Sequence, residues 1–188
     1  LAKEEVRAPA PLAEEDDSPE TGRVVPELGR DFREEALGGE DDGHLFMDIT
    51  GTRRLFGPPI DVAWRLHRRV KKELRLSPIW SVAPNKLIAK VATRLVKPAG
   101  EYIVGEGEEA AFLAPLPLHL LPGMEPPDLT QLRALNLTRS GQVAALTAEQ
   151  LRVPFGRRAG FIHDTVRGVD PSPVRPPEAS PPQVTHAH

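Results

Sequence analysis

The chain has 188 residues, a formal net charge of −3 and 39% hydrophobic residues, enough for one medium domain or two small ones. It contains no cysteine, which excludes disulfides, thiolate metal sites and cysteine nucleophiles. No apolar run approaches the roughly 20 residues needed to cross a bilayer, and the acidic start does not resemble a signal peptide, so we expect a soluble cytoplasmic protein.

Charge is distributed unevenly along the chain. Residues 1–42 hold 14 Asp/Glu against 5 Lys/Arg, a net of −9, with few large apolar residues. Such a composition buries too little apolar surface to offset chain entropy, so we predict an acidic segment that is disordered or non-homologous to the rest of the chain. Residues 53–97 carry 12 Lys/Arg and only two acids, which suits a polyanion, although a solvated surface is the alternative.

The first predicted elements alternate between strand and helix. Residues 45–50, "LFMDIT", read as a strand, followed by turn residues. From Pro58 onward, apolar side chains recur at helical spacing, and Ser77–Ala83 reads as a second strand. The helical stripe consists of Ile60, Ala63, Trp64, His67, Val70 and Leu74.

A second predicted helix, "NKLIAKVATRLVK", has one apolar face and one cationic stripe. Pro84 can open this helix, Pro98 ends it, and "EYIVG" then reads as a strand. The resulting β-α-β-α-β order predicts a partial α/β layer over residues 43–106. The cationic stripe consists of Lys86, Lys90, Arg94 and Lys97.

The remaining chain divides into a helical region and a proline-rich end. Four segments between residues 107 and 169 have short helical patterns separated by proline and glycine, which predicts a small all-α second domain. Six of the residues from 171 to 182 are proline, so we expect 170–188 to be a linker or a disordered tail. The predicted class is therefore α+β.

Four motifs, "LFMDITGTRRLFG", "VAPNKLIAKVATRLVKPAGEYIV", "FLAPLPLHLLPG" and "FGRRAG…RGVDPSPV", occur in an order and spacing that resemble the palm and thumb of Y-family (UmuC/DinB-like) translesion DNA polymerases. The resemblance covers about residues 43–175. Within the family, the chain looks most like the ImuB-type branch. That resemblance implies a non-catalytic accessory factor in DNA repair and damage-induced (SOS) mutagenesis, associated with the bacterial nucleoid.

The resemblance also bears on metal binding. Active family members hold two metal ions with one early aspartate and an Asp-Glu pair on a palm strand. Aligning the family's Asp-x-Thr on Asp48-Ile49-Thr50 places Gly43 and His44 at the Asp-Glu positions. Glycine has no ligand, and an imidazole cannot replace two anionic oxygens for magnesium, so we expect no catalytic residue, metal or cofactor. A slipped alignment that restores Asp41 or Asp42 is the alternative, and it would imply a magnesium-dependent polymerase.

Cationic residues are the expected contacts to DNA phosphates. Lys86 matches the lysine that faces nucleotide phosphates in active relatives, and it begins the cationic stripe. The thumb resemblance implies a helix-hairpin-helix turn that presents backbone N–H groups to phosphate. The first such turn, Leu121–Pro127, has an acid at Glu125 followed by two prolines. The second, Arg139–Gln142, keeps a glycine and is the better candidate, with a plain helix connection as the alternative. The expected contacts are Lys86, Lys90, Arg94, Lys97, Arg139, Gly141, Arg157 and Arg158.

Three functions remain as hypotheses. We favour an accessory protein that binds primer-template DNA without sequence specificity. The resemblance implies a recombinase, the sliding clamp and a separate catalytic polymerase as further partners, and no membrane. The first rival is an active translesion DNA polymerase with relocated carboxylates, and the second is a protein-only scaffold that docks through its acidic and proline-rich ends.

Overall fold

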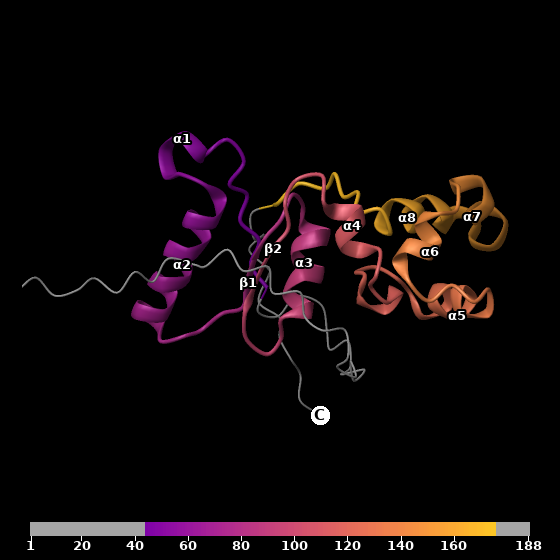
Figure 1. Cartoon of the computed structure of the whole chain (residues 1–188), viewed down its shortest axis with the longest axis horizontal. Helices are drawn as coiled ribbons and strands as arrows, with labels where there is room; N and C mark the ends of the chain where they lie inside the picture. The colour runs from indigo at the N-terminus through magenta and orange to yellow at the C-terminus, as the bar shows by residue number, and fades with distance from the viewer. Residues whose placement is uncertain (1–43, 176–188) are drawn as a thin grey trace, which may run out of the picture.

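The computed structural model describes residues 44–175, and its elements succeed one another along the longest axis (Figure 1). Helices α1 and α2 lie at one end, a small sheet with α3 in the middle, and the shorter helices at the other end. The elements are α1 (Arg53–Phe56), α2 (Pro59–Leu74), β1 (Trp80–Val82), α3 (Lys86–Leu95), β2 (Glu101–Ile103), α4 (Glu109–Leu113), η1 (Leu118–Leu120), α5 (Pro126–Ala134), α6 (Ser140–Ala144), α7 (Ala148–Phe155), η2 (Gly156–Arg158) and α8 (Ala159–Thr165).

The sheet of the described part is a parallel pair. Trp80 of β1 lies opposite Glu101 of β2, and Val82 lies opposite Ile103. Parallel strands require a crossover connection, which α3 provides. The predicted strands at 77–83 and 101–105 are confirmed in position, although both are shorter than predicted.

The predicted strand at 45–50 is wrong. These residues form no strand, and Leu45 and Met47 are 80% and 52% exposed. The segment ends in a turn in which Thr52 N donates to Ile49 O at 3.2 Å. A strand needs a neighbour for its backbone N–H and C=O groups, and β1 and β2 pair with each other and with no third strand among residues 44–175. The order up to β2 is therefore α-α-β-α-β.

Helix α2 packs against β1 through its predicted apolar stripe. The ring of His67 lies 6.3 Å from that of Trp80, centroid to centroid. No residue of α2 is fully buried, and Leu74 at its end is exposed. A sheet of two three-residue strands covers only part of a 16-residue helix, which explains the incomplete burial.

Helix α3 connects the sheet to the helical half. Asn85 caps its N-terminus, because the side-chain Oδ1 accepts from Ile88 N at 3.0 Å. The predicted apolar face is buried and contacts side chains from the end of β2 and from α4. The buried members of this cluster are Leu87, Ile88, Val91, Ala92, Val104, Leu113 and Leu116.

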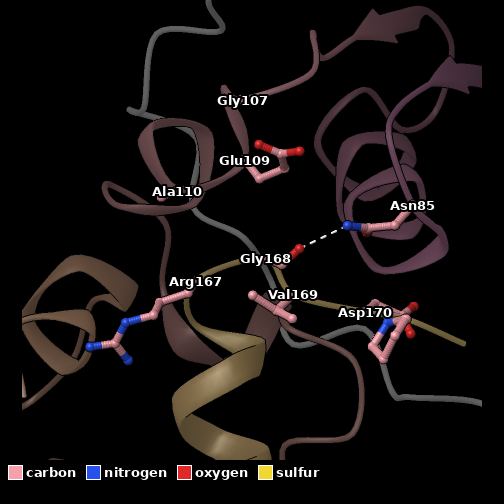
Figure 2. A pocket seen from close by; sticks show the side chains of 9 residues that line it. Asn85, Gly107, Glu109, Ala110, Arg167, Gly168, Val169 and Asp170 are labelled. Carbon is pink, nitrogen blue, oxygen red and sulfur yellow. Dashed lines mark hydrogen bonds between the residues drawn. The ribbon is translucent and has the colours of Figure 1, made fainter. Parts of the chain in front are cut away.

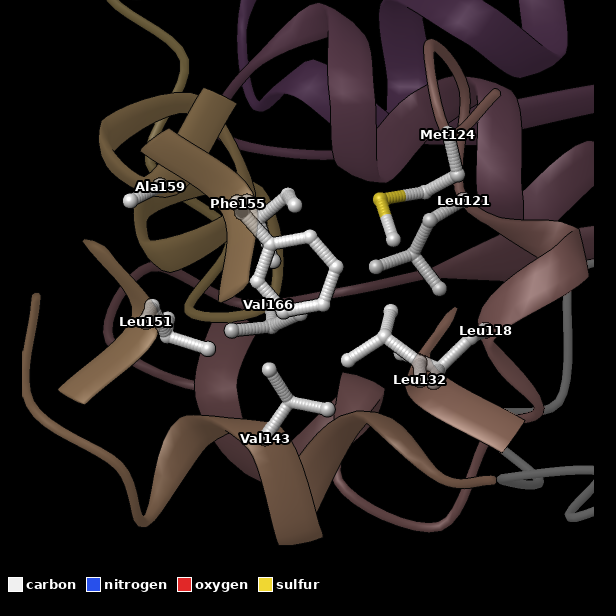
Figure 3. Packing of buried hydrophobic residues seen from close by; sticks show 10 residues of the cluster. Leu118, Leu121, Met124, Leu132, Val143, Leu151, Phe155, Ala159 and Val166 are labelled. Atoms are coloured by element: carbon white, nitrogen blue, oxygen red, sulfur yellow. The ribbon is translucent and has the colours of Figure 1, made fainter. Parts of the chain in front are cut away.

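The helical half has its own core (Figure 3). The predicted helical segment at residues 139–156 divides into α6 and α7, because Thr147 starts a new helix with a capping box. Gln150 N donates to Thr147 Oγ1 at 3.2 Å, and Thr147 N donates to Gln150 Oε1 at 2.8 Å. The core consists of Leu118, Leu121, Met124, Leu132, Val143, Leu151, Phe155, Ala159, Ile162 and Val166.

The first residues of the segment predicted as a linker or disordered tail, from residue 170 onward, contact the folded part of the chain. Asp170 and Pro173 accept hydrogen bonds from the first turn of α3. The predictions for residues 1–42, and for the proline-rich end beyond residue 175, lie outside the described residues. None of the helices between His44 and Arg175 is long and apolar enough to span a membrane.

Candidate nucleic-acid interface

The segment that aligns with the metal-binding strand of active family members forms a turn. Asp48 Oδ1 accepts from Thr50 N at 2.8 Å, and this backbone bond, with a second from the Thr50 side chain, lowers the pKa of the exposed Asp48 carboxyl. His44 is also exposed, while Gly43, Asp41 and Asp42 lie outside the described residues. Within residues 44–175, no three His, Cys, Asp or Glu side chains lie close enough together to hold a metal ion.

The cationic stripe on α3 contains side chains in different environments. Lys86 is partly exposed, and its Nζ donates to Pro173 O at 2.9 Å. Arg94 is half-buried, and its Nη1 donates to Leu120 O at 2.7 Å. Burial lowers the pKa of Arg94. Lys90 is half-buried, and Lys97 is exposed just beyond the helix.

Arg94 therefore differs from the role expected of it. Its guanidinium joins α3 to η1 of the helical half, as a link between the two parts. The side chain of Lys97 is exposed, as a phosphate contact requires, and that of Lys86 is partly exposed. The helical periodicity predicted all four cations on one face, but it could not predict the hydrogen bond from Arg94 to Leu120 O.

The second candidate turn uses its N–H groups internally. Ser140 N donates to Leu116 O at 2.9 Å, and Gly141 N donates to Ala114 O at 3.0 Å. A Cβ added at Gly141 would lie 3.0 Å from the same Ala114 oxygen, so the glycine permits close approach of α6 to the end of α4. Arg139 Nη1 donates to Pro115 O at 2.5 Å. The Gly141 N–H is thus occupied in this structure.

The paired arginines before α8 also differ from each other. Arg158 Nη2 lies 2.5 Å from Asp128 Oδ2 and 2.7 Å from Gly123 O, and Nη1 lies 3.3 Å from Glu125 Oε1. The hydrogen bond to Asp128, more than the surrounding charges, raises the pKa of Arg158. Arg157 is exposed. Of the pair, Arg157 is the one positioned for solution contacts.

Two hydrogen bonds that the sequence did not predict join the start of α3 to the segment after α8 (Figure 2). Asn85 Nδ2 donates to Gly168 O at 2.8 Å, and Leu87 N donates to Asp170 Oδ2 at 3.2 Å. Arg167 points the other way and donates to the carbonyls of His163, Ala144 and Leu146 at 3.0, 2.5 and 2.8 Å.

Asn85, Arg167, Gly168 and Asp170 help to line a pocket of about 390 Å³ between α3, α4 and the segment after α8. Asn85 at the start of a helix was a recognisable cap. The hydrogen bond from Asn85 to Gly168 joins residues 83 positions apart, and no pattern in the sequence predicted it.

Comparisons with known proteins point to one family. The model of the impB/mucB/samB family matches residues 23–94, so the match begins upstream of the boundary at residue 43 that composition predicts. DNA polymerase IV from Desulfatibacillum aliphaticivorans is 37% identical over 135 residues, covering 72% of this chain and 34% of the relative. DNA polymerase IV from Halorhodospira halophila is 35% identical over 131 residues, covering 70% of this chain and 37% of the relative.

Solved structures show the same fold. The crystal structure of DinB from Sulfolobus solfataricus matches with a TM-score of 0.54 and 21% identity, over 64% of this chain and 36% of that one. An insertion ternary complex of Dbh DNA polymerase matches with a TM-score of 0.55 and 21% identity, over 65% and 37%. The predicted α+β class is thereby confirmed. The chain spans about a third of the length of these relatives.

Proposed function

We propose that this chain, which carries part of a Y-family DNA polymerase by sequence and by fold, binds the phosphate backbone of primer-template DNA. The observation that carries the proposal is the exposure of Lys97 after α3 and Arg157 before α8, together with the partly exposed Lys86. Contacts to phosphate hold DNA without reading its sequence. The expected binding is therefore non-specific and sensitive to salt.

The other predicted contacts take different roles in this proposal. Three of them support the fold that carries the exposed cations, because each donates a hydrogen bond to a main-chain carbonyl. They are Arg94, Arg139 and Arg158. Lys90 is a half-buried neighbour of the exposed cations. Gly141 acts by allowing α6 to approach α4, with its N–H already donated.

We further propose that the protein is a non-catalytic accessory factor of the ImuB type in translesion synthesis or damage-induced mutagenesis. The support comes from the alignment on Asp48-Ile49-Thr50, which leaves Gly43 and His44 at the family's carboxylate positions. Asp48 itself accepts from its own turn and faces solvent. A recombinase, the sliding clamp and a separate polymerase are the partners that this role implies, and affinity capture after nuclease treatment tests each of them.

An active polymerase is the second candidate, and the names of the relatives favour it, since both are DNA polymerase IV. It would require Asp41 and Asp42 to act as magnesium ligands. Primer extension in the presence of magnesium separates the two candidates. The accessory role predicts no extension, whereas extension that is abolished by D41N/D42N would establish the polymerase.

The DNA-binding proposal is tested by paired substitutions in the full chain. K97Q/R157Q removes two proposed phosphate contacts, and R133Q/R152Q removes two exposed arginines outside the proposed interface. We expect the first variant to weaken binding equally for two oligonucleotides of unrelated sequence, while the second binds like the parent. If both variants weakened DNA binding equally, the binding would reflect the total charge of the protein and not an interface at Lys97 and Arg157.

A further inference from the structure

The largest concentration of positive charge in the described chain lies away from the proposed interface, on α1 and α2. Eight exposed cations occur between residues 53 and 75, against two acids, Asp61 and Glu73. We call this surface the α2 basic face. Its cations are Arg53, Arg54, Arg65, Arg68, Arg69, Lys71, Lys72 and Arg75.

Some of these cations are engaged locally. Arg69 Nε lies 2.9 Å from Glu73 Oε1, and the Arg65 guanidinium donates to the carbonyl of Phe56. Arg68 lies 4.6 Å from the centroid of the Trp64 ring. These contacts engage one of the two acids and leave most of the positive charge of the face uncompensated within residues 44–175.

The side chains of Lys71 and Lys72 in the last turn of α2 are exposed and make no hydrogen bond or ion pair to another residue of the described part. Two adjacent lysines at a helix C-terminus are stabilised by the helix dipole, but they remain available to an external anion. The α2 basic face is therefore a predominantly positive surface, and most of its charge has no counter-charge in the described part of the chain.

We propose that the acidic segment, residues 1–42, is the occupant of the α2 basic face. Its net charge of −9 complements the net of +6 on residues 53–75, and both follow from the sequence. The segment includes a run of four acids at Glu14–Asp17. A polyanion in the same chain has an effective concentration on the order of millimolar at the α2 basic face. A separate partner at a lower concentration in solution competes poorly with it.

The tether is long enough for this contact. Asp17 lies 27 positions before His44, the first described residue, and a chain of that length reaches at most about 90 Å. A 16-residue helix is about 24 Å long, so chain length does not prevent Glu14–Asp17 from reaching the α2 basic face. The contact is held by charge and depends on ionic strength, which distinguishes it from apolar docking.

Energy transfer between two dyes tests the proposal directly and requires no DNA, so its outcome is independent of the DNA-binding proposal. The chain lacks cysteine, and S18C/S77C therefore places one dye beside Glu14–Asp17 and one just after α2. We expect high transfer efficiency at about 0.01 M salt and low efficiency at about 1 M, as the Debye length falls from about 30 Å to about 3 Å.

Two variants of the labelled chain separate this contact from general chain contraction. K71Q/K72Q should move the low-salt efficiency toward the high-salt value, whereas R133Q/R152Q, which removes the same charge from α5 and α7, should leave it unchanged. Far-UV circular dichroism confirms that both variants keep their helices. Efficiency that does not depend on salt, or that is equal in the parent and K71Q/K72Q, would overturn the proposal.

Discussion

Arg158 Nη2 lies 2.5 Å from Asp128 Oδ2, and this ion pair ties the residues before α8 to the first turn of α5. The Asp128 side chain also accepts from Glu125 N at 3.1 Å. Asp128 is only 6% exposed, so its charge depends on these partners. Arg158, which the sequence analysis predicted to contact DNA, thus stabilises the first turn of α5.

Replacing Arg158 by alanine should destabilise the protein. The change leaves the buried Asp128 without its cation, and because a third of the Arg158 side chain is exposed, the expected loss is about 1–3 kcal/mol. Chemical unfolding of R158A measures it. The neighbouring R157A, which removes an exposed side chain, should stay within about 0.5 kcal/mol of the parent. Equal stability of the two variants would show that the ion pair contributes nothing.

Gly123 has a backbone φ of +76°, and a Cβ there would lie 2.5 Å from Phe161 Cζ. G123A should therefore cost about 1–2 kcal/mol for the left-handed backbone and a further 1–3 kcal/mol, roughly, for the clash. Gly107 is the matched control, because its φ is +84° and no atom lies within 4 Å of its added Cβ. The melting temperature should fall further for G123A than for G107A, and F161A should recover part of the difference.

Asp170 should slow hydrogen exchange at the start of α3. Its Oδ2 accepts from Leu87 N at 3.2 Å, so D170A should expose that amide and lower stability by about 1–2 kcal/mol. Hydrogen exchange followed by NMR resolves the Leu87 amide individually. E106A removes an exposed carboxyl elsewhere and is the control. Unchanged exchange at Leu87 in D170A would contradict the contact.

The Asp48 carboxyl should titrate below its ordinary pKa of 3.8, because its charged form accepts from Thr50 N. A depressed folded pKa means that the turn is stabilised above the unfolded pKa and loses this stabilisation as pH falls through the folded value. NMR titration should show the Thr50 amide shift following the Asp48 midpoint. A midpoint at or above 3.8 would contradict this hydrogen bond.

The local elements of the fold could be predicted from patterns within short windows. Helices α2 and α3 followed from apolar spacing, and the break between β2 and the helical half followed from proline and glycine. The strand at 45–50 was predicted wrongly because its composition suits a strand, whereas a strand also requires a neighbour, and the described sheet offers none.

The candidate site was less predictable for a related reason. Charge and spacing identified the cations, but the partner of each lies far along the chain: Arg94 meets Leu120 O, and Arg158 meets Asp128. Exposed Lys97 and half-buried Arg94 look alike in a helical pattern. Only the packing of η1 against α3 distinguishes a cation that links two elements from one that faces solvent.

We propose that exposed cations of this chain bind DNA phosphates. Fluorescence anisotropy of a labelled primer-template, measured across a series of salt concentrations, tests this binding. Log affinity should fall with log salt with a slope of roughly −2.7, as expected for phosphate contacts by Lys86, Lys97 and Arg157, and K97Q/R157Q should make the slope shallower by about 2. Absence of binding at low salt, or an unchanged slope in K97Q/R157Q, would contradict the claim.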